Sequence, residues 1–255
     1  MSFPNRVFII PYRNRPKEKE MLDSFFKKLK IDRKWSDSEV DFIYINQTDK
    51  RLFNRGAMKN IGFLYIKNEF PNNYKDITLI FHDVDFYPDS TSLLPYNAKK
   101  GEVEHYYGFD FTLGGIFSIN ADDFEKTGGF PNYWGWGYED NLIYERCKSK
   151  KIKVNRDNFY KIYDKHFIYL DDGDKNNSNK LVSEIEIQHY RYYKEKQTIS
   201  DLINIKLIRE NDFINVLSFD TGYTYNKRDL SIKNLARGKL RARPGYFKRN
   251  WRMLR

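Results

Sequence analysis

Three features that would place the chain in other protein classes are missing from the sequence. It has a single cysteine, Cys147, so no internal disulfide can form, and a reducing compartment fits best. No apolar run approaches the ~20 residues of a membrane-spanning helix. Residues 1–6 lead into a short apolar run without the pattern of a signal peptide. We therefore expect a cytoplasmic protein, and 255 residues suffice to bury a core without disulfides.

Positive charge is concentrated at one end of the chain. The formal net charge is +10, but residues 236–255 carry eight Lys or Arg and no acid, which leaves +2 for residues 1–235. This tail also contains Tyr246, Phe247 and Trp251. It can hold the protein at the periphery of an anionic membrane or on a polyanionic glycan, or it can be a solvated chain end. Nucleic acid is an unlikely partner, because its binders usually carry a basic face on the fold itself.

Apolar runs alternate with amphipathic stretches in the first third of the chain. The predicted elements are strands over Val7–Ile10, Val40–Ile45 and Ile77–Phe81, with helices opened by Pro16 and beginning near Asn54. This order predicts an α/β fold, a mainly parallel sheet with helices on both faces. Ligands bind such sheets at the carboxyl ends of the strands, where residues 11–15, 46–55 and 81–85 should converge.

The rest of the chain gives a mixed pattern. We expect a strand, a short helix, a Gly- and Trp-rich loop, a helix, a mobile polar loop, another helix and strand-like segments, over Gly115–Asn120, Ala121–Thr127, Gly128–Tyr138, Glu139–Lys150, Leu170–Lys180, Tyr192–Arg209 and Phe213–Leu235. Neither an internal repeat nor a domain linker is evident before about Arg237. The domain prediction is one domain over residues 1–235 and a basic tail over residues 236–255.

Two carboxylates follow the third predicted strand, in the segment Phe81-His82-Asp83-Val84-Asp85. One carboxylate of an Asp-x-Asp pair can hold a divalent cation that bridges diphosphate oxygens, while the other accepts hydrogen bonds from sugar or ribose hydroxyls. The same pattern also occurs in ordinary turns.

A second segment, residues 128–140, places Trp134 and Trp136 between glycines and ends in Glu139 and Asp140. Indole rings pack on the apolar faces of sugar rings, and glycines allow a lid to move. The segment therefore favours a hinged, sugar-stacking surface next to two carboxylates. An aromatic core loop capped by acids is the alternative.

Five motifs, in order along residues 6–235, resemble the β-1,4-galactosyltransferase family, metal-dependent inverting glycosyltransferases with the GT-A fold. They are Pro11-Tyr12-Arg13-Asn14-Arg15, then Asn46-Gln47 with Phe53-Asn54-Arg55, then Asp83-Val84-Asp85, Gly114-Gly115 and Trp134–Asp140. The resemblance implies a Rossmann-like, mainly parallel twisted sheet flanked by helices. It also implies Mn²⁺-dependent transfer of galactose or a related hexose from a UDP-sugar to a glycan or glycoconjugate.

The resemblance implies a role for each matching position. Asp140 would be the general base, Glu139 would contact acceptor and donor, and Asp85 would bind Mn²⁺. The remaining positions would bind the UDP-sugar donor, Trp136 as part of a mobile lid: Pro11, Arg13, Arg15, Phe53, Arg55, Asp83, Val84, Gly115, Trp136 and Gly137. Guanidinium groups suit this task because they form paired hydrogen bonds with phosphate and sugar oxygens. For the two arginines after the first strand, plain surface charge is the alternative.

The further metal ligands implied by the resemblance are His166 and Asp164, since an imidazole beside carboxylates suits Mn²⁺. His189 is the rival to His166, which can also be a surface histidine.

Three departures from the family's pattern keep the substrates open. Thr112 stands where galactosyl enzymes carry a tyrosine, which leaves room for UDP-N-acetylgalactosamine or another UDP-hexose. Tyr138 replaces a small residue before Glu-Asp, so the identity of the acceptor cannot be inferred from the family. His82 before Asp-Val-Asp resembles the xylose-specific branch of the family, but one residue does not identify an acceptor. Animal relatives carry an anchor, a stem and disulfides, and we expect none of these in this protein. A non-catalytic glycan-binding module is the rival class, but it gives no reason for Asp85 and Asp140 to occur together.

Overall fold

The structure, a computed structural model, describes residues 3–135, 137–170, 181–183, 190, 194–222 and 230–232. Several predictions fall outside these ranges, namely those on Trp136, on the loop over residues 171–180, on His189 and on the tail over residues 236–255. None of the helices in the described ranges has the length and apolar character that crossing a membrane requires.

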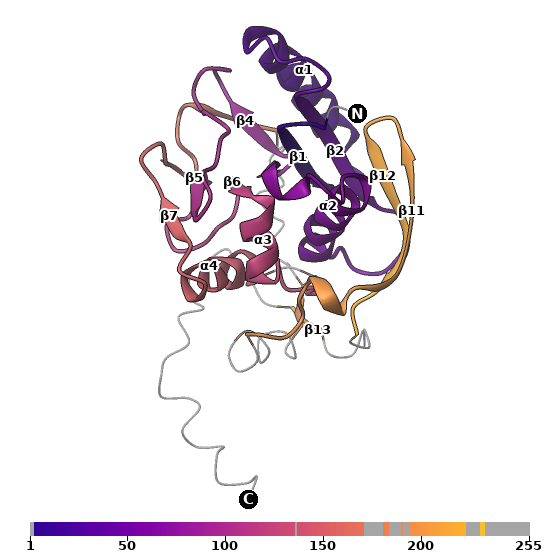
Figure 1. Ribbon diagram of the computed structural model, residues 1–255. Helices are drawn as coiled ribbons and strands as arrows, with labels where there is room; N and C mark the ends of the chain where they lie inside the picture. Colours follow the sequence, from indigo (N-terminus) through magenta and orange to yellow (C-terminus); the bar gives the residue numbers. More distant parts are fainter. Residues whose placement is uncertain are drawn as a thin grey trace, which may run out of the picture.

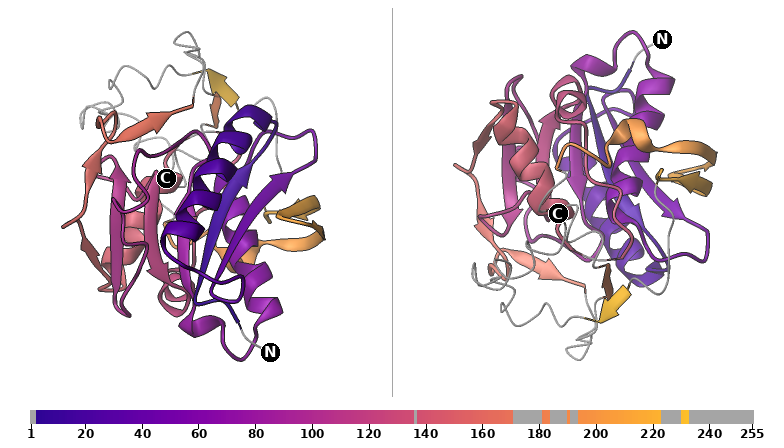
Figure 2. Two further views of the ribbon diagram at one scale, coloured as in Figure 1. Left: turned by 90° about the horizontal axis from the view of Figure 1, so that it is seen from above. Right: turned by 90° about the horizontal axis from the view of Figure 1, so that it is seen from below.

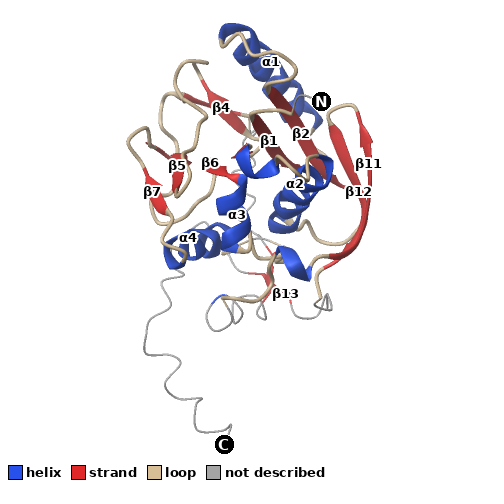
Figure 3. Ribbon diagram, in the orientation of Figure 1, coloured by secondary structure: helices blue, strands red, loops and turns tan. Residues whose placement is uncertain are grey.

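The predicted elements of the first 82 residues and of residues 115–150 are confirmed to within a few residues. The helices are α1 (Pro16–Asp32), α2 (Arg55–Glu69), α3 (Ala121–Thr127) and α4 (Glu139–Ser149), with 3-10 helices η1 (Tyr74–Asp76) and η2 (Ile199–Asp201). The strands are β1 (Arg6–Tyr12), β2 (Val40–Gln47), β3 (Thr78–His82), β4 (Phe86–Pro88), β5 (Glu102–Gly108), β6 (Ile116–Asn120), β7 (Lys153–Asn155), β8 (Tyr160–Lys161), β9 (Phe167–Tyr169), β10 (Leu181–Ser183), β11 (Ile203–Glu210), β12 (Phe213–Asp220) and β13 (Leu230–Ile232). Figure 3 shows helices and strands in separate colours.

A nine-stranded sheet forms the centre of the molecule, in the order β11-β12-β2-β1-β3-β6-β5-β7, with β8 also paired to β5 (Figure 1). Strands β12, β2, β1 and β3 are parallel to one another. Strand β6 is antiparallel to both β3 and β5. The pairs β4-β9 and β10-β13 form two small separate sheets. The structure therefore confirms the predicted α/β fold with a mostly parallel sheet.

Helices cover both faces of this sheet, as predicted. The side chains of β1 alternate: Val7 and Ile9 join the core cluster that contains α2, α3 and α4, whereas Phe8 and Ile10 join the cluster under α1. In Figure 2, the indigo helix α1 lies over the sheet in the left view, and helices from later in the chain lie over it in the right view. The apolar face of α1 consists of Leu22, Phe25, Phe26 and Leu29, as its spacing predicts.

The Gly-rich loop over residues 128–135 is fixed to α2. The side chain of Asn60 donates a hydrogen bond to the carbonyl of Phe130 at 2.8 Å and accepts one from its N–H at 2.9 Å. Gly56 permits the close approach, because a Cβ there would lie 2.1 Å from the carbonyl oxygen of Pro131. This part of the predicted lid is therefore bound tightly to the helix.

The helix predicted over residues 192–209 is wrong in its described part, which contains the 3-10 helix η2 and the strand β11. Apolar residues in this stretch have helical spacing, but β11 instead pairs antiparallel with β12. Asn211 adopts a positive φ of 55° in the tight turn between the two strands, as hairpin turns require. Hydrogen bonding to the sheet edge therefore outweighs the local periodicity.

Candidate active site

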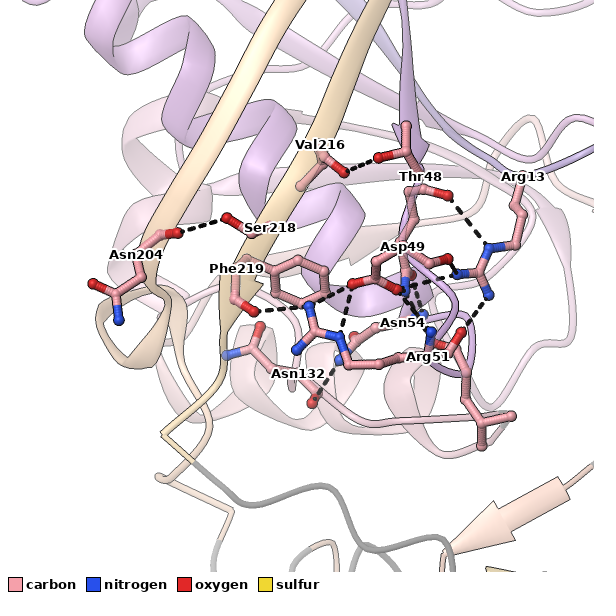
Figure 4. A network of polar contacts seen from close by, with 12 residues as sticks. Arg13, Thr48, Asp49, Arg51, Asn54, Asn132, Asn204, Val216, Ser218 and Phe219 are labelled. Carbon is pink, nitrogen blue, oxygen red and sulfur yellow. Dashed lines mark hydrogen bonds and ion pairs between the residues drawn. The ribbon is translucent and has the colours of Figure 1, made fainter.

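Three loops meet at the carboxyl edge of the sheet, as the sequence predicts. They follow β2, β1 and β3, which are adjacent and parallel. Arg13, just after β1, donates hydrogen bonds to the carbonyl oxygens of Asp49 at 2.6 Å and Arg51 at 2.7 Å (Figure 4). Phe53 lies in the same loop, with its ring centroid 5.7 Å from the Arg13 guanidinium. The predicted donor-binding residues Arg13 and Phe53 are thus brought together.

The other predicted donor-binding residues near these loops differ in accessibility. Pro11 in β1 and Val84 after β3 are buried. Arg15 precedes α1, where its guanidinium donates to Glu18 at 2.7 Å and its charge acts on Asp85. Arg15 is therefore better placed to contact the UDP-sugar directly than Pro11 and Val84, which are buried.

Arg55, the first residue of α2, joins the Asp-x-Asp segment to α4. Its Nε and Nη2 donate to the two carboxylate oxygens of Asp83 at 3.1 and 2.5 Å. Its Nη1 donates to Glu139 at 2.8 Å and to the two oxygens of Asp140 at 2.9 and 2.8 Å. Asn54 caps this end of α2 by accepting a hydrogen bond from a backbone N–H, which fixes the start of the helix. One side chain therefore gathers three of the predicted site carboxylates.

Burial and charge act in opposite directions on Asp83 and Arg55. Burial alone would raise the pKa of Asp83, but the charges of Arg55 and Lys59 outweigh it and hold that pKa below its usual value. Burial would likewise lower the pKa of Arg55, yet the charges of Asp140, Asp83 and Glu139 raise it well above its usual value. Both groups are therefore ionised at neutral pH.

Asp85 lies in a different electrostatic environment from Asp83. Burial, followed by the charge of Asp83, raises the pKa of Asp85 to about 6. The ion pairs of the site end on Asp83, Glu139 and Asp140, and none between described residues involves the Asp85 side chain. A carboxylate held in this way suits a divalent cation, which would compensate its charge.

The structure does not bring His166 and Asp164 to Asp85. His166 Nδ1 lies 2.8 Å from a carboxylate oxygen of Asp164, and the backbone of His166 pairs with Asp89 at one end of the β4-β9 ladder. Asp85 lies at the other end, where its carbonyl accepts from Leu170. Asp85 and Asp89 are four positions apart along the strand, which is about 13 Å. Among the described residues, no three His, Cys, Asp or Glu side chains gather as a metal site.

Glu139 and Asp140 open α4 as predicted, and the preceding residues hold the first of them. Glu139 is 5% exposed and accepts a hydrogen bond from the N–H of Gly137 at 3.0 Å. Tyr138 adopts a positive φ of 66° and stacks on Tyr190 with ring centroids 4.6 Å apart. Gly137 therefore supports Glu139 through its backbone, and the Tyr138 ring packs on a neighbour.

The Gly114-Gly115 pair provides space for Asp140. A Cβ on Gly114 would lie 2.5 Å from Oδ2 of Asp140. Gly115 has a φ of +71°, and a Cβ there would lie 2.3 Å from the carbonyl oxygen of Tyr107. The carbonyl of Gly115 accepts a hydrogen bond from the N–H of Asp83 at 3.3 Å. Both glycines therefore shape the carboxylate cluster, Gly115 through its backbone.

We expect Gly114→Ala to impair the site while leaving the fold intact. Its added methyl group must displace the Asp140 carboxylate, so turnover should fall about 100-fold, as for other small displacements of reacting groups. The thermal unfolding midpoint should move by only a few degrees. Steady-state kinetics and a thermal melt of the same preparation test this, and full activity in the variant would contradict it.

Trp134 does not form the sugar-stacking surface predicted for the two indoles. It is 4% exposed and stacks on Phe219 with ring centroids 5.2 Å apart and an interplanar angle of 19°. The guanidinium of Arg51 lies 4.5 Å from its ring centroid. Of the two alternatives, the aromatic core loop is therefore correct for Trp134, because β12 offers it an aromatic partner.

His105 and Arg156 hold the backbone of Gly114 and Thr112 in place. The buried His105 lies with Nε2 3.1 Å from the carbonyl oxygen of Gly114, and Arg156 donates to its Nδ1 at 3.1 Å. Burial lowers the pKa of His105 to about 4, so the ring is neutral and Nε2 donates. Arg156 also donates to the carbonyl of Thr112, whose side chain is 5% exposed. The Thr112 side chain thus faces the interior in this structure.

Sequence reasoning misses Lys59. This side chain is 0% exposed, and its Nζ lies 3.6 Å from both Asp83 and Asp140. It follows Arg55 by four residues, so both cations lie on one face of α2. A lysine four residues after Arg55 on a predicted helix is the signal in the sequence from which Lys59 could have been identified.

Comparisons with known proteins identify the family of the chain. A family profile described as the N-terminal region of glycosyl transferase group 7 matches residues 3–96, and one described as the N-terminal domain of galactosyltransferase matches residues 98–168. The chain is 31% identical over 163 residues to β-1,4-galactosyltransferase 4 of Cricetulus griseus, covering 59% of this chain and 44% of the relative. It is 25% identical over 220 residues to β-1,4-galactosyltransferase 7 of Drosophila melanogaster, covering 83% and 60%. The chain spans less than half of the first of these relatives.

Solved structures share the fold. The catalytic domain of Drosophila β-1,4-galactosyltransferase 7, in a complex with xylobiose, has a TM-score of 0.66 at 19% identity, covering 83% of this chain and 93% of that chain. A mutant of the same enzyme, in a complex with manganese, UDP-Gal and xylobiose, has a TM-score of 0.65 at 19% identity with the same coverage. The fold is that of the GT-A glycosyltransferases. The two profiles and the relatives show that the chain belongs to the β-1,4-galactosyltransferase family.

Proposed function

We propose that this chain transfers galactose, or a related hexose, from a UDP-sugar to a glycan acceptor with inversion and with Mn²⁺. The observation that carries the proposal is the bridge made by Arg55. This side chain joins Asp83 of the Asp-x-Asp segment to Glu139 and Asp140 of α4. The three carboxylates lie 28, 84 and 85 positions after Arg55 in the sequence. A turn or a core loop gives no reason for such convergence at the ligand-binding edge of the sheet.

The chemistry requires one group to remove a proton and one to stabilise a leaving group. In an inverting displacement the acceptor hydroxyl attacks the anomeric carbon opposite the departing diphosphate. Asp140 would take the hydroxyl proton as the new bond forms, because it opens α4 at the sheet edge beside a site for the donor. Glu139, held by Gly137, would orient acceptor and donor hydroxyls. Arg55 and Arg15 would bind diphosphate oxygens through their guanidinium groups.

The residues expected to bind a divalent cation fit this role only in part. Asp85 suits Mn²⁺, because its carboxylate is held in a partly buried setting without an ion pair from the described residues. A bound Mn²⁺ supplies positive charge to the diphosphate leaving group. Asp164 and His166 lie too far along the β4-β9 ladder to join Asp85 in this conformation.

The proposal is tested by release of UDP from a panel of donors. UDP-galactose, UDP-N-acetylgalactosamine and UDP-glucose are each supplied with monosaccharide and xyloside acceptors, with Mn²⁺ or with chelator. We expect metal-dependent turnover of one donor, with UDP-galactose first. Because Thr112 is buried, it is not expected to select between the two galacto-configured donors by itself. UDP binding without turnover of any donor would favour a glycan-binding module.

The acceptor is proposed to be a hydroxyl group of a free sugar or of a glycan. Support comes from the Drosophila relative, whose crystal structures contain xylobiose. His82 does not itself select the acceptor, since it is 0% exposed and its Nδ1 lies 2.6 Å from the backbone carbonyl of Asp83. Xylosides therefore enter the panel because of the relatives, not because of His82.

We also propose that the basic tail binds an anionic surface. The support is its composition, eight cations and three aromatic residues within residues 236–255. Truncation after Leu235 should abolish binding to vesicles that contain anionic lipid and to sulfated glycan, and binding by the full chain should weaken as salt is added. UDP binding by the truncated chain serves as the control for folding. Equal vesicle and glycan binding by both chains would exclude this role.

A further inference from the structure

We propose that Lys59 is a positioning residue for Asp140, a fixed buried cation that holds this carboxylate when Arg55 engages the donor. The inference rests on the proposed function, since it assumes that Asp140 is the base. Lys59 lies four residues after Arg55 on the same face of α2 and is 0% exposed.

The surroundings of Lys59 distinguish it from a surface lysine. Its Nζ lies 3.6 Å from a carboxylate oxygen of Asp83 and 3.6 Å from one of Asp140. Nζ has no hydrogen-bond partner among the described residues, and the ring of Phe130 lies 4.7 Å away. A buried ammonium group is costly unless nearby charge compensates it, so these two carboxylates account for its burial. The cation is thus aimed into the site and directed at Asp83 and Asp140.

The contacts of Arg55 explain why a second cation is needed. Nη1 of Arg55 donates to both oxygens of Asp140, at 2.9 and 2.8 Å. A donor diphosphate would compete for the same guanidinium, so this contact would loosen when the donor binds. Lys59 then remains as the cation beside Asp140. It keeps the carboxylate oriented and keeps positive charge next to it.

The charged groups around Asp140 in the described chain are Arg55 and Lys59 from α2, Glu139 from α4 and Asp83 after β3. The titratable but neutral His105 of β5 also lies near it. Removing Lys59 takes away one of the two cations, whereas the acidic neighbours remain.

The test compares Lys59→Met with Lys59→Arg and with Lys67→Met, a control on the exposed part of the same helix. Lys59→Met should lower kcat about 10-fold or more and shift the acidic limb of the kcat–pH profile upward by about one pH unit, since a nearby cation is lost. Lys59→Arg should return the limb toward the wild-type position, and Lys67→Met should leave it unchanged. An acidic limb in Lys59→Met that superimposes on the wild type would overturn the proposal, whatever its kcat.

A second measurement does not depend on activity. In a double-mutant cycle followed by thermal unfolding, Lys59→Met should cost less in the Asp140→Asn background than in the wild type, because the neutral partner no longer needs a cation. If Lys59→Met alone does not fold, folding of the double variant gives the same support. Additive losses would overturn the coupling. Turnover by Asp140→Asn with coupling intact would instead overturn the proposed role of the base and leave the Lys59 contact standing.

Discussion

Asp140→Asn should slow sugar transfer severely while donor binding survives. The substitution preserves shape and a hydrogen-bond acceptor for Arg55 but removes the group that takes the acceptor proton, so kcat should fall by about 10²–10⁴-fold. Asp140 contacts Arg55 and Lys59 and lies against Gly114, a setting that fixes its position. Affinity for UDP, measured by calorimetry, should stay within about 3-fold of the wild type, because Asp140 is not proposed to hold the nucleotide.

Glu145→Gln is the matched control for this variant. Glu145 lies on the same helix, where it accepts a hydrogen bond from Tyr190 at 3.0 Å and pairs with Lys194. Its loss should leave kcat unchanged. Turnover by Asp140→Asn at the rate of this control would remove Asp140 as the base.

Asp85→Asn should have two opposite effects, loss of metal affinity and gain of stability. The variant removes the carboxylate that the site offers to a cation, so Mn²⁺ affinity should fall at least about 100-fold. His166→Ala is the informative comparison, because His166 pairs with Asp164 at the far end of the β4-β9 ladder. On this geometry His166→Ala should change Mn²⁺ affinity by less than about 3-fold. Equal losses in both variants would show that β9 rearranges on metal binding.

The gain in stability follows from the direction of the pKa shift of Asp85. Its folded-state pKa is raised to about 6, chiefly by burial and by Asp83, from about 3.9 in an unfolded chain. The unfolded chain therefore loses this proton first, and the folded state loses stability as pH rises from about 4 to 6. At pH 7.5 without metal, Asp85→Asn should be more stable than the wild type by about 1–3 kcal/mol.

Denaturant unfolding at pH 7.5 and at pH 4 measures this difference. The gain should be largest at pH 7.5 and shrink toward pH 4, where the carboxyl of the wild type is protonated. Asp89→Asn, an exposed residue four positions along, should be neutral at both values. A destabilised Asp85→Asn at pH 7.5 would contradict the account of an uncompensated carboxylate.

The sequence carries enough information to predict the three central parallel strands and the edge of the sheet at which the site lies. Parallel strands β1, β2 and β3 are short apolar runs, and the loops that follow them must meet at one edge, so the approach of Arg13 to residues 47–51 could be predicted. The start of α4 at Glu139 is likewise set by local residues. These features depend on the pattern within one or two neighbouring elements.

Features that depend on distant partners could not be predicted in this way. The apolar residues around Ile203 and Leu207 suit a helix by spacing, but β12 provides a strand edge and Asn211 the turn that makes them a strand. The residues around Trp134 predict an exposed sugar platform, but Phe219, 85 residues later in the sequence, covers the indole. The link that Arg55 makes between Asp83 and Asp140 is likewise visible only in the folded chain.

The configuration of the product tests the central claim most directly. The sugar in UDP-galactose is α-linked, so attack opposite the diphosphate must give a β-linked product, and proton NMR of the isolated glycan reads this from the anomeric coupling. We predict a β-galactosyl product that forms with Mn²⁺ and forms at least about 100-fold more slowly in Asp140→Asn. An α-linked product would contradict the displacement at the site that Arg55, Asp83 and Asp140 define.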